Sequence, residues 1–244
     1  MIKQFQTLDS NMFTCLAAVD RTVYRVILSL LLASIFAQVH AEEWVPVYEE
    51  PRHHLVFENE HALVLDVNLP PGYVSLYHQH VLDVLYVTIG GTTVYAQPLG
   101  GTRREAKVEV GDLRFSSDNH ELPHIHQVGN IGETPFHVIA VGMKDKMVGM
   151  EHPIEGDPSG ITKVMAKPHA SVWRVYLKAG EKSGRHTHKL PFVEVFMNTA
   201  RLKNQWGKTQ HVEAGDFQWY PGDTTRQYVN AGDEDLEIIL VQWH

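Results

Sequence analysis

The chain has 244 residues, of which 43% are hydrophobic and 20% are charged. These proportions are ordinary for a globular protein, and the length leaves room for two small domains, each with its own core. The formal net charge of −8, and the lack of a basic cluster with interleaved aromatic residues, argue against a nucleic-acid partner.

The N-terminal segment has the three parts of a secretory signal peptide. Arg21 and Arg25 precede an apolar run at residues 26–37, and small residues follow up to Ala41. The run of about 12 residues is shorter than the roughly 20 that a membrane span needs. We therefore predict a signal peptide at residues 1–41, export to the periplasm or the extracellular space, and no stable membrane insertion after cleavage. An uncleaved anchor helix is the alternative.

The rest of the chain consists of short runs of strand-forming residues that end at glycine or proline turns. Residues 63–69, 84–89 and 107–110 are examples, and no stretch after residue 42 has a sustained helical period. Strands of this length and spacing are typical of an all-β barrel or sandwich. Residues 143–162 are rich in glycine and proline and lack periodicity, which indicates a linker.

A two-histidine motif occurs twice, 108 positions apart, at residues 72–80 and 180–188. Each copy reads glycine, five residues, histidine, one residue, histidine. Because alternate residues of a β-strand point to the same face, each pair directs two imidazoles into one space, as a metal site requires. The two pairs are His78 with His80, and His186 with His188.

The repeat extends beyond the histidines. An Asn-x-Gly sequence at residues 130–132 returns at 230–232, and the apolar run at 136–141 returns at 236–241. This ordered series indicates two related units in tandem. We place them at residues 42–145 and 162–244, with a linker at 146–161.

These motifs resemble those of the cupin superfamily, in its two-domain form, the bicupin. The family's first motif is G-x5-H-x-H followed by an acidic residue and a glycine, and its second is a late histidine followed by an asparagine. The residues that fit are Gly72, His78, His80, Gly90, His126 and Asn130. Over nearly all of residues 55–244, the resemblance implies two tandem double-stranded β-helix barrels, or RmlC-like jelly rolls, with metal bound in the barrel.

The resemblance implies that His78, His80 and His126 are the metal ligands of the first unit. His124 would share the face of His126, so it is an alternative third ligand or a supporting neighbour. Iron, manganese, nickel, copper and zinc all accept imidazole, and the sequence does not choose among these divalent metals.

The family's glutamate is missing from this pattern. Its expected positions hold Val84 and Leu85, and Asp83 comes one residue too early, so Asp83 is a weaker candidate ligand. A set of three histidines resembles the iron sites of cupin thiol and diketone dioxygenases.

The second unit departs further from the pattern. When the units are aligned through Asn130 and Asn230, Arg226 takes the place of His126. A guanidinium keeps its proton and cannot act as a ligand. We therefore expect a degenerate second site, in which Arg226 either forms a structural salt bridge or binds a carboxylate ligand.

Other histidines fall outside both motifs. His53, His54 and His152 are expected on the surface, and His120 in an exposed loop.

The sequence thus predicts a secreted, metal-binding bicupin with one divalent metal, acting on a small-molecule ligand or substrate. A dioxygenase with a three-histidine centre is the leading enzymatic interpretation. A cupin isomerase or lyase, and a non-enzymatic small-ligand-binding cupin, are the alternatives. The sequence leaves a homo-oligomer open.

Overall fold

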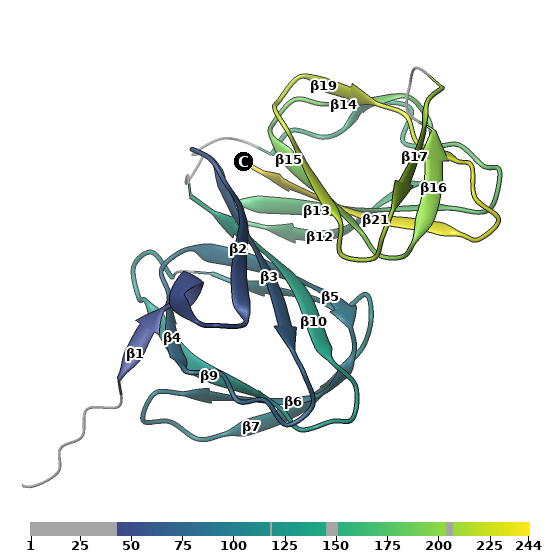
Figure 1. The fold of residues 1–244 in the computed structure, drawn as a ribbon. Coiled ribbons are helices and arrows are strands. Elements are labelled where there is room, and N and C mark those ends of the chain that lie inside the picture. The colour runs from purple at the N-terminus through teal and green to yellow at the C-terminus, as the bar shows by residue number, and fades with distance from the viewer. Residues whose placement is uncertain (1–42, 118, 145–150, 204–206) are drawn as a thin grey trace, which may run out of the picture. The chain divides into compact units, whose positions relative to one another are not determined.

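Strands and turns make up the described part of the chain, together with one short 3-10 helix (Figure 1). The computed structural model describes residues 43–117, 119–144, 151–203 and 207–244. The predicted signal peptide at 1–41, and residues 146–150 of the predicted linker, lie outside these described residues. The expectation of an all-β protein is confirmed.

In the described residues, the first half of the chain forms two five-stranded sheets, with the orders β1-β4-β9-β6-β7 and β2-β3-β10-β5-β8. The elements are β1 (Trp44–Pro46), η1 (Val47–Glu49), β2 (His53–Glu58), β3 (Ala62–Leu69), β4 (Tyr77–His80), β5 (Asp83–Gly90), β6 (Thr92–Pro98), β7 (Arg104–Val108), β8 (Leu113–Ser116), β9 (His124–Asn130) and β10 (Phe136–Met143).

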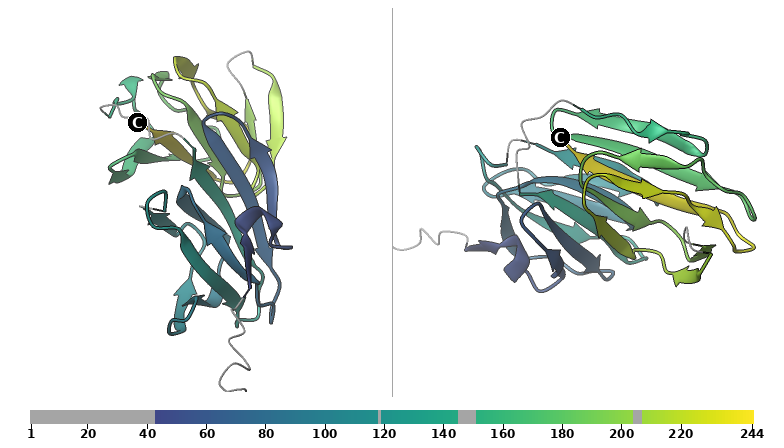
Figure 2. Two further views of the ribbon diagram at one scale, coloured as in Figure 1. Left: turned by 90° about the vertical axis from the view of Figure 1, so that its left-hand side faces the viewer. Right: turned by 90° about the horizontal axis from the view of Figure 1, so that it is seen from above.

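The second half repeats this arrangement (Figures 1 and 2). Its strands are β11 (Glu155–Gly156), β12 (Ile161–Lys167), β13 (Ala170–Leu177), β14 (His186–His188), β15 (Phe192–Phe196), β16 (Ala200–Lys203), β17 (Thr209–Val212), β18 (Phe217–Tyr220), β19 (Thr224–Arg226), β20 (Val229–Asn230) and β21 (Leu236–Trp243). The sheet β12-β13-β21-β15-β18 has the strand order of β2-β3-β10-β5-β8. The other strands form two three-stranded sheets, β11-β14-β19 and β17-β16-β20, within the described residues.

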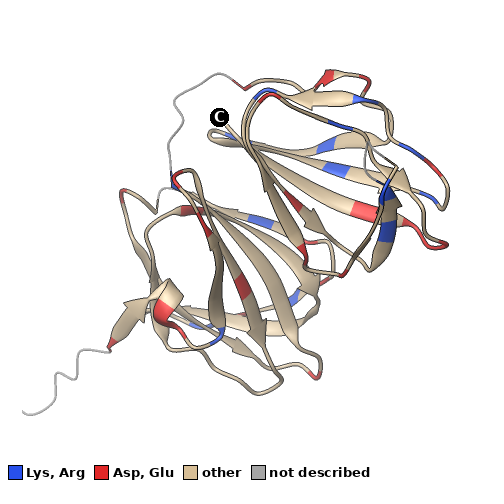
Figure 3. Cartoon of the chain, turned by 45° about the horizontal axis from the view of Figure 1, so that its top comes forward, with Lys and Arg blue, Asp and Glu red and all other residues tan. Residues whose placement is uncertain are grey.

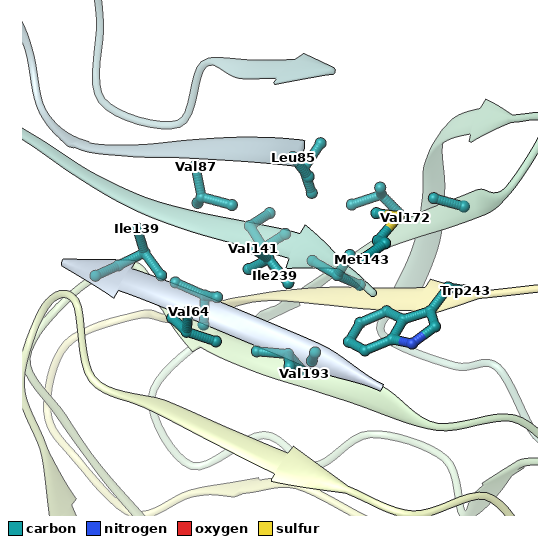
Figure 4. Packing of buried hydrophobic residues seen from close by; sticks show 14 of the residues in the cluster. Val64, Leu85, Val87, Ile139, Val141, Met143, Val172, Val193, Ile239 and Trp243 are labelled. Atoms are coloured by element: carbon teal, nitrogen blue, oxygen red, sulfur yellow. The ribbon is translucent and has the colours of Figure 1, made fainter. Parts of the chain in front are cut away.

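The central strands are apolar on both faces, so each half needs cover on two sides. On β3, Val64 and Leu65 point to opposite faces and belong to different buried clusters. Leu65 packs inside the first half, against residues such as Val84 and Ala140. Val64 joins a cluster to which β13, β15 and β21 also contribute, seen in Figure 4. This second cluster explains why these strands read as continuous apolar runs.

The turn that begins each two-histidine motif has the same construction in both halves. Gly72 and Gly180 have φ angles of +78° and +77°, a region that glycine enters without steric cost. The backbone N–H of Gly72 donates to Asn130, and that of Gly180 donates to Asn230. The side chain of Asn130 donates in turn to the carbonyls of Leu69 and Thr134. Asn130, which belongs to the second family motif, therefore stabilises the turn at Gly72 that begins the first family motif.

Charged residues are spread over strands and loops, with lysine and arginine interspersed among aspartate and glutamate (Figure 3). Among the described residues there is no helix long and apolar enough to cross a membrane.

Candidate metal centre

The pairing of β4 with β9 brings four histidines onto one face. The strands are antiparallel, with His78 opposite His126 and His80 opposite His124. Because residues two apart share a face, all four imidazoles point to the same side of the sheet. Nitrogen atoms of His78, His80 and His126 lie within 4.8 Å of one another. These three side chains are buried, with exposed fractions of 0%, 3% and 8%.

The spacing of the nitrogens fits a shared metal ion. The Nε2 atoms of His80 and His126 are 3.2 Å apart. Two nitrogens bound about 2.1 Å from one ion would be separated by about 3.0 Å at a right angle and about 3.4 Å at a tetrahedral angle. A hydrogen bond between two imidazoles would also explain this one contact. It would not explain His78, whose buried Nε2 has no hydrogen-bond partner in the described part of the chain.

The tautomer of His78 is set by its backbone. Its Nδ1 lies 2.9 Å from the carbonyl oxygen of Leu76, which can only accept a hydrogen bond. The Nδ1–H therefore donates to that carbonyl, and the lone pair of the neutral ring is on Nε2, toward the other two histidines. An orphaned lone pair in a buried space is what a metal ligand presents before the ion binds.

The buried histidines are held in the neutral form. Burial lowers the pKa of His78 to about 4. Burial, followed by repulsion from neighbouring imidazoles, lowers the pKa of both His80 and His126 well below the usual range. At neutral pH all three rings thus carry the lone pair that coordination needs.

The two weaker candidate ligands, His124 and Asp83, do not belong to this group of three. His124 is half-buried, with its ring centre 4.5 Å from that of His126, and burial lowers its pKa. Asp83 is buried, and its Oδ1 accepts a hydrogen bond of 3.1 Å from the backbone N–H of Asn119. Neither belongs to the group of three converging nitrogens, so His124 is a neighbour of the cluster and Asp83 fastens a loop.

The expectation that His53 lies on the surface is wrong. Its side chain is buried, because β2 pairs with β3 and places His53 opposite Val67. The Nδ1 atom of His53 is 2.5 Å from Oε2 of Glu50, and its ring centre is 4.4 Å from that of His78. The comparison of the two repeats could not find this pair, because the positions 108 residues later hold Pro158 and Ile161.

Glu50 is itself firmly held. Its carboxylate accepts hydrogen bonds from the hydroxyl of Tyr73 at 2.8 Å and from the backbone N–H of Arg52 at 2.7 Å. Burial alone would raise the pKa of Glu50, but the hydrogen bonds from His53, Arg52 and Tyr73 outweigh it and lower the pKa to about 2. Glu50 is therefore ionised beside the histidine cluster.

The equivalent place in the second half is closed by a salt bridge. Arg226 lies opposite His186, just as His126 lies opposite His78. Its Nε and Nη2 atoms donate to Glu194 at 2.8 and 3.1 Å, and Glu194 is completely buried. Of the two expectations for Arg226, the structural salt bridge is the one observed. The Nε2 atoms of His186 and His188 find no hydrogen-bond partner among the described residues.

A cavity of about 150 Å³ adjoins the three-histidine cluster at His80. Its walls come from β1, η1, β3, β4 and the turn after it, β5 and β10, and they are mainly apolar. The lining residues include Val47, Leu63, Leu65, Val84, Ala140 and Gly142. The cavity has room for a small organic molecule beside His80, the one residue of the cluster that lines it.

No family model matches the chain. Several solved structures resemble it. AerE from Microcystis aeruginosa has 12% identity and a TM-score of 0.57, and the match covers 80% of this chain and 98% of AerE. Oxalate decarboxylase from Lactobacillus farciminis, in complex with formate, has 15% identity, a TM-score of 0.54, and coverage of 78% and 83%. Salicylate 1,2-dioxygenase from Pseudoaminobacter salicylatoxidans has 11% identity, a TM-score of 0.53, and coverage of 77% and 72%.

These are structures of the cupin superfamily, and the likeness shows that this chain has the cupin fold. At such low identity, activity and substrate do not transfer with the fold.

Proposed function

We propose that the chain is a bicupin that binds one divalent transition metal through His78, His80 and His126 and uses it on a small molecule. The convergence of three buried imidazoles, with the orphaned Nε2 of His78 among them, carries this proposal. The interpretation of the chain as two barrels is supported by the repeated strand order. It is also supported by the match to AerE, which covers 80% of this chain and so extends over more than one half.

A metal held there would polarise an oxygen atom as a Lewis acid or, if it is redox-active, would activate dioxygen by electron transfer. The protein's own part is to keep three neutral donors in place and to seat a small, largely apolar molecule in the cavity beside His80. Three histidines without a carboxylate are also the ligand set that the resemblance to cupin dioxygenases implies. A small-molecule dioxygenase is therefore the enzymatic function that we favour, ahead of an isomerase or lyase.

A non-enzymatic binding protein is the second candidate. The observation that favours it is the salt bridge between Glu194 and Arg226, which occupies the place in the second half that corresponds to His126 in the first. Oxygen uptake by iron-loaded protein in the presence of candidate substrates separates the two functions.

Metal analysis of protein purified without a polyhistidine tag tests the metal centre. We expect about one equivalent of metal per chain, and we expect His78→Ala to remove most of it because two imidazoles bind an ion more weakly than three. His211→Ala is the matched control, since His211 is exposed on β17. Full metal occupancy in His78→Ala would contradict the proposed ligand set.

We also propose that the protein is exported after cleavage behind Ala41. The support is the sequence of a basic, an apolar and a small-residue segment at residues 1–41. Mass spectrometry of protein from the extracytoplasmic fraction should find Glu42 as the first residue. An intact leader on cytoplasmic protein would rule this proposal out.

A further inference from the structure

Glu50 and His53 form a second buried polar pair beside the three-histidine cluster. The ring of His53 contacts that of His78, with centres 4.4 Å apart and planes at 50°. His53 is not part of the group whose nitrogens lie within 4.8 Å of one another. Two ligands bound about 2.1 Å from one ion are at most about 4.2 Å apart. His53 therefore lies outside the group that could share one ion, although its ring contacts that of His78.

The orientation of the His53 ring is fixed by hydrogen bonds. Its Nδ1 is taken by Glu50, and Glu50 is fixed in turn by Tyr73 and the backbone of Arg52. The other ring nitrogen, Nε2, makes no hydrogen bond within the described residues. Because Glu50 occupies Nδ1, Nε2 is the ring nitrogen of His53 that remains for a ligand.

An oxygen about 2.1 Å from an ion and about 2.8 Å from Nε2 would link His53 to a metal that the three histidines hold. Three histidines leave at least one coordination position for such a ligand. The negative charge of Glu50 also acts on the cluster, because it raises the pKa of His78 whereas burial lowers it.

We propose that His53, held by Glu50, positions the oxygen-bearing ligand at the coordination position that His78, His80 and His126 leave open. The ligand is a water molecule or the oxygen of a small substrate, hydrogen-bonded to Nε2. This inference rests on the proposed metal centre, and it gives the buried pair the role of selecting what binds opposite the histidines. Glu50 acts through His53.

Cobalt(II)-loaded protein tests the inference by visible absorption, which reports both the metal and its ligands. The probes are azide, which only accepts hydrogen bonds, and acetohydroxamate, which also carries an N–H donor, so one of them can bond to Nε2 in either protonation state. In His53→Phe we expect one equivalent of cobalt, bound as tightly as in the wild type. The dissociation constant of at least one probe should rise about tenfold, the effect of losing one hydrogen bond to a charged partner.

Three further variants keep the test specific. His53→Gln retains an amide at this place and should recover part of the probe affinity, whereas Glu50→Gln should lose part of it by loosening His53. His54→Phe is the matched control, since its exposed side chain neighbours His53 on β2, and it should match the wild type. If His53→Phe fails to fold by circular dichroism, His53→Gln and Glu50→Gln carry the comparison.

Two results would overturn the inference while leaving the metal centre intact. Unchanged affinity for both probes in His53→Phe would show that His53 does not touch the open position. Loss of cobalt from a folded His53→Phe would show that His53 is a ligand rather than a positioning residue. Failure of the wild-type protein to bind cobalt is a different outcome, which defeats the proposed metal centre and the inference together.

Discussion

His78 shows how burial and one hydrogen bond prepare a side chain for coordination. The carbonyl of Leu76 fixes its tautomer, and burial lowers its pKa to about 4. An exposed histidine of ordinary pKa, about 6.5, would already be partly protonated in mildly acidic solution. The buried ring remains a neutral donor there, so proton competition for the metal is weaker at this site than at a surface histidine.

The same lowered pKa makes the stability of the metal-free protein depend on pH. Above pH 6.5 the ring of His78 is neutral in both the folded and the unfolded chain. Between 6.5 and about 4 the unfolded chain takes up a proton that the folded chain does not, so the free energy of unfolding falls as the pH falls. Each such histidine contributes up to about 1.4 kcal/mol per pH unit.

We therefore expect the thermal midpoint of the metal-free protein to decrease from pH 7 to pH 5, and to decrease less steeply in His78→Gln. Circular dichroism melts at pH 7, 6 and 5 measure this. His211→Ala should keep the wild-type slope. Identical slopes in His78→Gln and the wild type would show that His78 is not protected from protonation by the fold.

At the scale of strands, the alternation of side chains between two faces predicted which residues of the two-histidine motifs lie together. The H-x-H spacing placed His78 and His80 on one face of β4, and the alignment of the repeats placed Arg226 where β19 pairs it with His186. Strand periodicity could not predict the position of His53. Its burial depends on the pairing of β2 with β3 and on the carboxylate that η1 and the following turn bring to it. Such contacts between distant segments leave no local pattern in the sequence.

For the whole molecule, the main feature is that two halves with the same strand order have different polar centres. The first half keeps three converging imidazoles, and the second replaces one of them with a salt bridge. A bare guanidinium about 4 Å from a divalent ion would repel it by about 8 kcal/mol at an effective dielectric constant of 20. Glu194, whose Oε1 is 2.8 Å from Arg226 Nε, offsets much of that charge. The missing lone pair, more than repulsion, is therefore the reason why we expect no metal at the second site.

This argument predicts that metal belongs to the first half alone. His126→Ala should abolish metal binding, while His186→Ala, which changes the counterpart of His78, should leave about one equivalent per chain. Inductively coupled plasma mass spectrometry measures both. Two equivalents in the wild type, or loss of metal in His186→Ala, would contradict the asymmetry.

Arg226→His supplies the missing imidazole but leaves the carboxylate of Glu194 without its cationic partner, at a cost of about 3–5 kcal/mol for a broken buried pair. Combining it with Glu194→Gln removes the unpaired charge, and the folded double variant should bind a second equivalent, because His186 and His188 already have unpartnered Nε2 atoms in the described structure.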